Sequence, residues 1–395
     1  ADPVTISGIS DDGGWRDVAG NAMAVSSGNF PIAGANLSSV KSVEVDLTKP
    51  YIASITATPL TGNFGIHDAI NNPSVIPITI IFNEEVTLDA SATITVYVDA
   101  KATGLSAIGS ADITTPSGEN FSQATVTYQV AEGDASTSLD VSSIEITGSD
   151  FTKLKDDLHY NSNSAASLVV PGGNSLADNT TLVIETTRPI IGKISSTYGN
   201  GTYGEDAAIP VRAYFYNGSA VGSQEAVTLT GGSLTLTMNT GGSASISSIP
   251  TANYGNGTYT VGSGDTETAQ LTVSSPMVLG TARIVDIYGN ALDSTTAPTD
   301  NFSSVTNNAI VIDVTKPAIQ TITAKKNGSA ITIPDPGLPA NIVTVAKDDQ
   351  IEFTFNFNES TKLSGTATLT LNSGGSVTWA AYSDKDAPTA TYTVE

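Results

Sequence analysis

The stretch Val45-Asp46-Leu47-Thr48-Lys49-Pro50 recurs twice further along the chain, as Ile184-Glu185-Thr186-Thr187-Arg188-Pro189 and as Ile312-Asp313-Val314-Thr315-Lys316-Pro317. The three copies share an aliphatic residue, an acid, any residue, a threonine, a base and a proline, and apolar residues flank each copy. Because proline has no N–H and ends a β ladder, each copy predicts a hinge between two β modules. The three prolines lie 139 and 128 residues apart, and this spacing predicts a tandem array.

The hinges divide the chain into four parts. Residues 48–187 and 188–315 each predict a complete β-sandwich, residues 1–47 the C-terminal part of a module, and residues 316–395 the N-terminal part of another. Alternating apolar and polar residues predict strands at 76–82, 92–98, 124–130, 182–184, 211–216, 233–238, 257–261, 269–273, 282–285, 309–312, 351–357, 365–371, 377–381 and 390–394. The one helix candidate, residues 150–160, is expected to be a short turn.

The composition limits the kinds of partner. The 395 residues carry 16 basic and 39 acidic side chains, a net charge of −23, yet only 14% of residues are charged. This charge repels nucleic acid and anionic membranes and attracts cations. Because few residues are charged in total, discrete divalent-ion sites explain the excess of acidic residues better than the acidic coat of a halophile.

The absence of cysteine excludes disulfides and thiolate metal sites. The sequence contains no apolar run of about 18 residues, so it predicts no membrane helix. Its abundant Gly, Ser, Thr and Asn predict an all-β protein.

Other short motifs recur in a fixed order. They include Phe82-Asn83-Glu84-Glu85-Val86 and Phe357-Asn358-Glu359-Ser360, and the turns Asp17-Val18-Ala19-Gly20-Asn21 and Asp286-Ile287-Tyr288-Gly289-Asn290. Together with the hinge, these residues resemble the bacterial Ig-like repeats of large surface adhesins and S-layer proteins over essentially the whole chain. The resemblance implies tandem Ig-like β-sandwiches arranged as an elongated rod, a place at the cell surface, and Ca²⁺ at the joints.

A joint can offer Ca²⁺ carboxylate oxygens from three places: the turn before the last strand, the hinge acid, and the first loop of the next module. At the first joint we expect Asp17, Asp46 and Asp68, with Asn21 as a helper, and at the third Asp286, Asp313 and Asp349, with Asp348 and Asn290 nearby. The second joint has Glu185 and Asp206, but Val170 stands where the turn acid should be. We therefore expect this joint to bind metal weakly or not at all. The alternative is that each Asp only caps its own turn.

The two partial modules together approach the length of one repeat. The start Asp2-Pro3-Val4-Thr5-Ile6 resembles the continuation of the strand Tyr128-Gln129-Val130 in a complete module, and Tyr392-Thr393-Val394 resembles that strand. Two explanations stay open. Either the sequence is a piece of a longer array, or the partial modules of neighbouring subunits complete each other by strand donation and form a head-to-tail fibre.

The sequence does not favour an enzyme. His67 and His159 have no nucleophile motif or phosphate loop beside them, and Glu84 and Glu85 are adjacent strand residues that point to opposite faces. We expect a non-enzymatic extracellular protein of the cell surface, a fibre, stalk or surface-layer component that self-associates head to tail or in a lattice, without nucleic-acid binding or membrane insertion. The alternative is an adhesin that binds a host, matrix or glycan ligand through a residue such as Trp15, whereas Trp379 is expected in a core.

Overall fold

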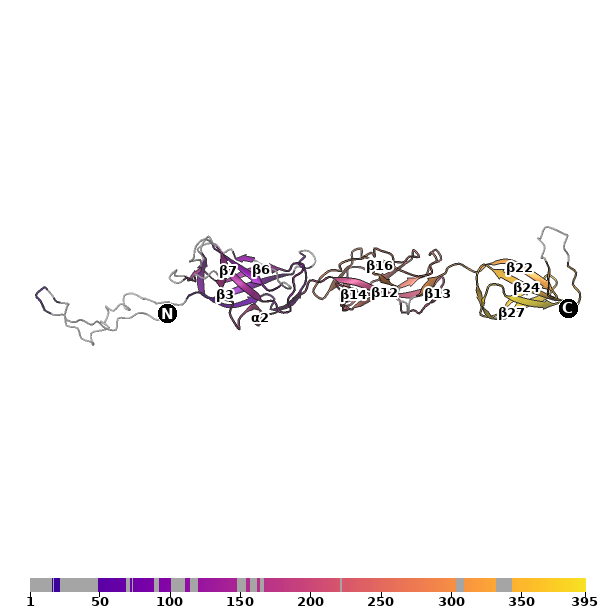
Figure 1. The fold of residues 1–395 in the computed structure, drawn as a ribbon, viewed down its shortest axis with the longest axis horizontal. Coiled ribbons are helices and arrows are strands. Elements are labelled where there is room, and N and C mark those ends of the chain that lie inside the picture. Colours follow the sequence, from indigo (N-terminus) through magenta and orange to yellow (C-terminus); the bar gives the residue numbers. More distant parts are fainter. Residues whose placement is uncertain are drawn as a thin grey trace.

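The computed structural model describes residues 16, 18–21, 49–68, 72, 74–88, 92–100, 111–113, 120–147, 154–156, 162–163, 167–220, 222–302, 309–331 and 343–395, and its elements and contacts are those of these residues. Their regular secondary structure is almost entirely strand, with one helix of four residues, which confirms the all-β prediction. Figure 1 shows three groups of strands in chain order. We call residues 48–187 module 1, residues 188–315 module 2 and residues 316–395 module 3.

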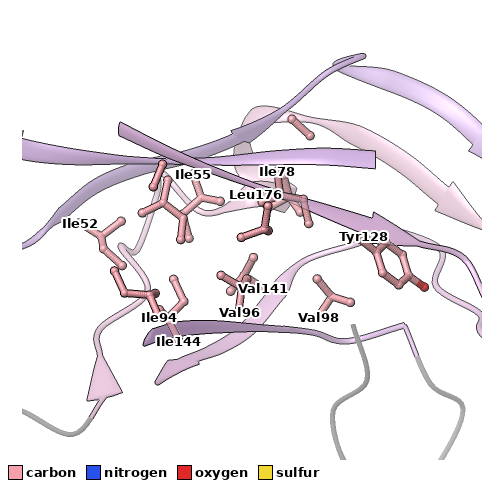
Figure 2. Close-up of a cluster of buried hydrophobic side chains, with 14 of the residues drawn as sticks. Ile52, Ile55, Ile78, Ile94, Val96, Val98, Tyr128, Val141, Ile144 and Leu176 are labelled. Atoms are coloured by element: carbon pink, nitrogen blue, oxygen red, sulfur yellow. The ribbon is translucent and has the colours of Figure 1, made fainter. Parts of the chain in front are cut away.

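Module 1 is a β-sandwich. Its strands are β1 (Ile52–Ala57), β2 (Thr61–Phe64), β3 (Val75–Leu88), β4 (Thr93–Val98), β5 (Ala111–Ile113), β6 (Asn120–Gln129), β7 (Val141–Thr147), β8 (Leu154–Asp156), β9 (Ser162–Asn163), β10 (Ser167–Leu168) and β11 (Thr181–Ile184). β3 lies at the centre of one sheet and pairs with β1 and β6, whereas β4 and β7 pair in the other sheet. Figure 2 shows Ile55 and Ile78 of the first sheet facing Val96 and Val141 of the second, and all four are buried. Each buried aliphatic side chain contributes about 1.5–3 kcal/mol, so this layer holds the sheets together.

Module 2 repeats this plan. Its strands are β12 (Pro189–Ser195), β13 (Gly201–Tyr203), β14 (Ala208–Asn217), β15 (Val227–Thr230), β16 (Leu234–Thr237), β17 (Ser243–Ile246), β18 (Tyr254–Thr260), β19 (Arg283–Asp286), β20 (Asp300–Asn301) and β21 (Ile310–Ile312). β14 lies between β12 and β18, as β3 lies between β1 and β6. A second core, separate from that of module 1, contains the buried side chains of Ile194, Phe215 and Tyr259.

The closing strand of each complete module runs parallel to the second strand. β11 pairs with β2, and β21 pairs with β13. The N–H of the hinge acid then continues the ladder, from Glu185 to the carbonyl of Phe64 at 3.0 Å and from Asp313 to that of Tyr203 at 3.1 Å. Each hinge acid therefore lies beside the loop that follows the second strand of its own module.

Module 3 contains β22 (Ile319–Lys326), β23 (Ser329–Ile331), β24 (Gln350–Phe357), β25 (Thr361–Leu363), β26 (Ala367–Thr370), β27 (Ser376–Trp379), β28 (Tyr382–Lys385) and β29 (Thr389–Thr393). β24 lies between β22 and β29, as in the other modules. The first strand has the same pairing irregularity in all three, after Ile52, Ile191 and Ile319. The repeat predicted from the hinge therefore extends to the hydrogen bonding of single residues.

Three local predictions differ from the structure. Residues 269–273 are not a strand, because Val273 makes only an isolated bridge with Met238. Within 150–160, the described residues form the short strand β8 instead of a turn. The helix α2 (Leu176–Asn179) was not predicted; Ser175 and Asp178 close its start with reciprocal side-chain to backbone hydrogen bonds. None of the helical structure in the described ranges has the length and apolarity needed to cross a bilayer.

Candidate metal centre between modules 1 and 2

The antiparallel pairing of β19 with β15 determines which side of module 2 meets module 1. Asp286, the last residue of β19, lies opposite Val227, the first residue of β15. The turn after β19 therefore lies beside the start of β15 and against the end of module 1. Two acids of module 2, Asp286 and Glu225, consequently come close to the hinge acid Glu185.

Asn290 connects the two modules directly. Its Oδ1 accepts a hydrogen bond from the Ile66 N–H at 2.8 Å, and its Nδ2 donates to the carbonyl of Glu185 at 3.0 Å. In the opposite direction, Nδ2 of Asn72 donates to the carbonyl of Tyr288 at 3.4 Å. Asn290 is 1% exposed, and hydrogen bonds shielded from water in this way are stronger than exposed ones. The joint is thus a packed contact, with polar groups matched across it.

Three carboxyl groups converge at the same joint. Glu185 belongs to module 1, while Glu225 and Asp286 belong to module 2, and one carboxylate oxygen of each lies within 4.8 Å of the others. Asp286 is buried, and the two glutamates are half-buried. Ca²⁺ binds oxygens at about 2.3–2.6 Å, so ligands on opposite sides of one ion are about 5 Å apart. The spacing of the three carboxylates fits a single cation.

The electrostatics of this cluster favour a cation. In the described part of the chain, no lysine or arginine forms a salt bridge with these three acids. Burial, followed by the charges of Asp286 and Glu185, raises the pKa of Glu225 to about 7. Burial also raises the pKa of Asp286, although Asn290 and Tyr288 donate hydrogen bonds to its carboxylate. Oε2 of Glu225 is buried and has no hydrogen-bond partner among the described residues. A bound cation would offset the repulsion and give this oxygen a partner.

The structure groups the expected ligands differently from the sequence prediction. The prediction places Asp286 beside Asp313 at the third joint, but Asp286 lies beside Glu185 at the second joint. It places Asp206 beside Glu185, but Asp206 lies at the other end of module 2, where its charge helps Glu205 to raise the pKa of Lys316. The late turn of a module therefore faces the preceding module, and the first loop faces the following one.

The other acids expected at the third joint bind neighbouring protein groups. Asp348 and Asp349 do not lie at that joint but at the opposite end of module 3, because Ile351 pairs with Lys326 at the far end of β22 and Phe357 pairs with Ile319 at the hinge end. The Asp313 carboxylate accepts the N–H of Thr315 at 3.1 Å. The N–H of Ala346, the ammonium of Lys326 and the amide of Asn327 lower the pKa of Asp349 to about 2. Asp348 has a left-handed backbone with φ 71°, and its N–H donates to the carbonyl of Val394 at 2.8 Å.

Two of the expected ligands of the first joint, Asp17 and Asp46, lie outside the described residues, as do Trp15 and His159. Asp68 exchanges two backbone hydrogen bonds with Asn72, of 2.6 and 2.9 Å, and lines a cavity at the second joint. Glu225 was not predicted, although a signal was present: Glu225-Ala226-Val227-Thr228-Leu229 matches Glu84-Glu85-Val86-Thr87-Leu88 of module 1 and Glu359-Ser360-Thr361-Lys362-Leu363 of module 3. Trp379 is 4% exposed and packs on Phe355 with ring centroids 4.4 Å apart, as expected for a core residue.

No family model and no curated protein matches the chain. Similar solved structures include latent PorU from Porphyromonas gingivalis, at 11% identity and a TM-score of 0.16, covering 89% of this chain and 31% of that one. Domains 1–6 of the surface layer protein SbsC are 13% identical with a TM-score of 0.16, covering 88% and 51%. E. coli alpha-2-macroglobulin is 7% identical with a TM-score of 0.17, covering 90% and 21%. The chain therefore spans about half or less of each of these proteins, and similarity at this level carries no argument about function.

Proposed function

We propose that this chain is a non-enzymatic structural protein of the cell surface, a component of a fibre, stalk or surface layer, in which Ca²⁺ stiffens the joint between modules 1 and 2. The carboxyl cluster of Glu185, Glu225 and Asp286 is the observation that carries this proposal. Three carboxylates offer up to six oxygens, and Ca²⁺ takes roughly six to eight, with water or carbonyls completing the shell.

The position of the cluster explains why an ion would matter mechanically. Glu185 is the last acid before the hinge proline of module 1. In module 2, Glu225 precedes β15, and Asp286 is the last residue of its partner strand β19. An ion bound by all three ties two separately packed cores together across the hinge. With Asn290 already bonded to the main chain of module 1, the ion would fix the angle between the modules. A fixed angle at each such joint would make an elongated rod.

The test is thermal unfolding of the chain in Ca²⁺ and in chelator, with Glu225→Gln and Glu132→Gln as a matched pair. Glu132 is an exposed acid near the same joint and outside the cluster. Ligand at 100 times its Kd stabilises the folded state by about 2.7 kcal/mol, so Ca²⁺ should raise the Tm of the parent and of Glu132→Gln by several degrees. The rise should be small or absent in Glu225→Gln. Identical melting curves in Ca²⁺ and chelator would remove the metal from the proposal.

Self-association by strand exchange is supported by module 3. Val343 and Val345 precede Asp348 at the spacing at which β13 precedes Asp206, and both aspartates have a left-handed backbone. In module 2, β13 pairs with the closing strand β21. In the described part of module 3, no strand pairs with residues 343–345, and Val343 and Val345 are 42% and 40% exposed. The sequence Val43-Glu44-Val45-Asp46 matches the closing strand Ile310-Val311-Ile312-Asp313, so we propose residues 43–46 of a second copy as the occupant.

A labelled peptide of residues 38–50 tests this exchange by fluorescence anisotropy against the chain of residues 1–395. Saturable binding is expected, together with loss of binding for a peptide with Val43→Asp and Val45→Asp, because the aspartates would face the core. Equal binding of the two peptides, or none, would contradict strand exchange and favour a closing strand from the same molecule.

A further inference from the structure

A cavity of about 310 Å³ opens at the joint between modules 1 and 2. Module 1 contributes Ile66, His67, Asp68 and Asn72 to its wall, the hinge contributes Arg188, and module 2 contributes Arg283, Gly289, Asn290 and Ala291. Small-molecule sites commonly begin at about 300 Å³ and occur at interfaces between domains. The volume is therefore enough for a group the size of one sugar ring.

The wall of this cavity carries positive charge in an acidic protein. Two of the chain's 16 basic residues, Arg188 and Arg283, line it, against the single carboxylate of Asp68. In the described part of the chain, all four salt bridges use lysine. The half-buried side chain of Arg188 has no hydrogen bond or ion pair with any described residue. A guanidinium has five N–H donors in a planar fork that matches a carboxylate.

The second arginine has a fixed place at the wall. Nη2 of Arg283 donates to the carbonyl of Gly289 at 3.2 Å, and Gly289 itself lines the cavity. This bond holds the guanidinium at the cavity wall. Asn290, anchored to both modules, holds the same wall in position. The cationic groups therefore stand on a joint that is already organised without a ligand.

His67 adds a third polar group. Its Nδ1 is buried without a hydrogen-bond partner, and its imidazole makes no hydrogen bond with a described residue. Turning this ring toward a ligand would break no hydrogen bond at Nδ1. Asp68, across the same cavity, has carboxylate oxygens that accept from hydroxyl groups. A ligand that has one carboxylate and several hydroxyls matches this combination of two arginines, one histidine and one acid.

We propose that this cavity binds a carboxylate-bearing sugar residue, with the carboxylate on Arg188 and Arg283 and the hydroxyls toward Asp68 and His67. The site goes beyond the proposed scaffold function, because it would let the joint attach the protein to an acidic polysaccharide. The site is formed by side chains other than those of the carboxyl cluster. Asn290 lines the cavity and donates to Asp286 at 2.8 Å, so a cation in the cluster would strengthen the binding of an anion in the cavity.

The test is calorimetric titration of the chain of residues 1–395 with glucuronate, glucose and sulfate, in Ca²⁺ and in chelator. We expect saturable binding of glucuronate, at least about tenfold weaker binding of glucose and of sulfate, and at least about tenfold weaker glucuronate binding by Arg188→Met, since a bidentate charged contact is lost. Lys347→Met, which removes an exposed base of module 3, should bind glucuronate like the parent. An unchanged melting temperature of Arg188→Met would show that the variant is folded.

Several results would overturn the proposal. They are equal affinity for glucose and glucuronate, sulfate binding as tight as glucuronate, no binding at all, or unchanged binding by Arg188→Met. To separate a free acidic sugar from the end of a polysaccharide, an oligoglucuronate is titrated as well, and tighter binding of the oligomer would identify the polymer as the source. Glucuronate binding that persists in chelator would support this site even if the metal proposal fails.

Discussion

Oδ1 of Asn290 in module 2 accepts a hydrogen bond of 2.8 Å from the backbone N–H of Ile66 in module 1. The same amide donates to the carbonyl of Glu185, so one buried side chain spans the end of module 1 from its first loop to its hinge. Both partners in module 1 are main-chain groups, so no change of side-chain rotamer in module 1 could keep these hydrogen bonds while the joint bends. Bending the joint would therefore break them. A joint of this kind resists bending before any ion is bound.

The joint can be opened without touching either core. A Cβ at Gly65 would lie 2.8 Å from the carbonyl oxygen of Tyr288, and the rigid main chain on the other side cannot yield cheaply. Gly65→Ala should therefore separate the modules while each keeps its fold. Gly172→Ala is the matched control, since a Cβ at Gly172 meets nothing within 4 Å.

The measurement uses the absence of cysteine in the chain. Spin labels are attached to Gln123→Cys in module 1 and to Ser247→Cys in module 2. Double electron–electron resonance then measures the distribution of distances between the two modules. We expect a narrow distribution in the parent and in Gly172→Ala, and a broad one in Gly65→Ala. A narrow distribution in all three would show that the joint is not held by this contact.

The pKa of Glu225 predicts how stability depends on pH without metal. This carboxyl has a pKa of about 7 in the folded state against an ordinary 4.5, so the folded state binds the proton more tightly. The contribution is fully present below pH 4.5 and is lost as pH rises to about 7. After a discount for partial exposure, we expect module 2 to lose about 1–2 kcal/mol across this window.

Urea unfolding in chelator at pH 5 and pH 7.5 measures this loss, and Glu225→Gln should remove it, because the amide does not titrate. Ca²⁺ competes with the proton for the same oxygens, so its affinity should rise over the same pH window. A parent protein whose pH dependence equals that of Glu225→Gln would show that the carboxyl is not perturbed.

The sequence predicted the modules better than it predicted how they meet. Hinge prolines and alternating residues are local signals, and they located β4, β6 and β14 within a few residues, whereas β3 runs on to Leu88, past its predicted end at Phe82. The grouping of the acids depends on which end of a sandwich each turn occupies. That is set by the antiparallel pairing of β15 with β19, a contact between residues more than 50 positions apart. Glu225 was missed for the same reason, because only this pairing brings it beside Asp286.

A buried pair that repeats between modules gives a stability prediction. The phenol of Tyr128 donates to Oδ2 of Asp134 at 2.7 Å, the N–H of Ala131 donates to the same oxygen at 2.8 Å, and Asp134 is fully buried. Module 2 has the same arrangement in Tyr259 and Asp265. Asp134→Ala leaves the buried phenol of Tyr128 without its acceptor, at about 1–3 kcal/mol, and also removes the acceptor of the part-buried N–H of Ala131, worth about 1 kcal/mol.

Calorimetry should therefore show the unfolding of module 1 destabilised by about 2–4 kcal/mol in Asp134→Ala. Glu352→Ala is the control, since it removes only an exposed salt bridge with Lys325 at 3.4 Å, worth under about 1 kcal/mol. Equal effects of the two substitutions would mean that the buried pair does not stabilise the module.

The first strands of modules 1 and 3 offer a matched comparison within one molecule. Ile55 and Ile322 occupy the same position of the repeat, three residues after the isoleucine that precedes the shared irregularity, and each lies opposite the central strand of its sheet. Ile55 is fully buried, whereas Ile322 is 41% exposed, and Ile319 is 48% exposed where Ile52 is 3% exposed. Ile55→Ala should lower the free energy of unfolding by about 2–5 kcal/mol. Ile322→Ala should lower it by under about 1 kcal/mol in the dilute chain, because it leaves no buried cavity.

If residues 43–46 of a second copy cover the face of β22 that carries Ile322, the cost of Ile322→Ala should rise toward that of Ile55→Ala at high protein concentration. Urea unfolding over a hundredfold range of concentration would reveal this, and a cost that stays constant over that range would argue that no second copy covers the face.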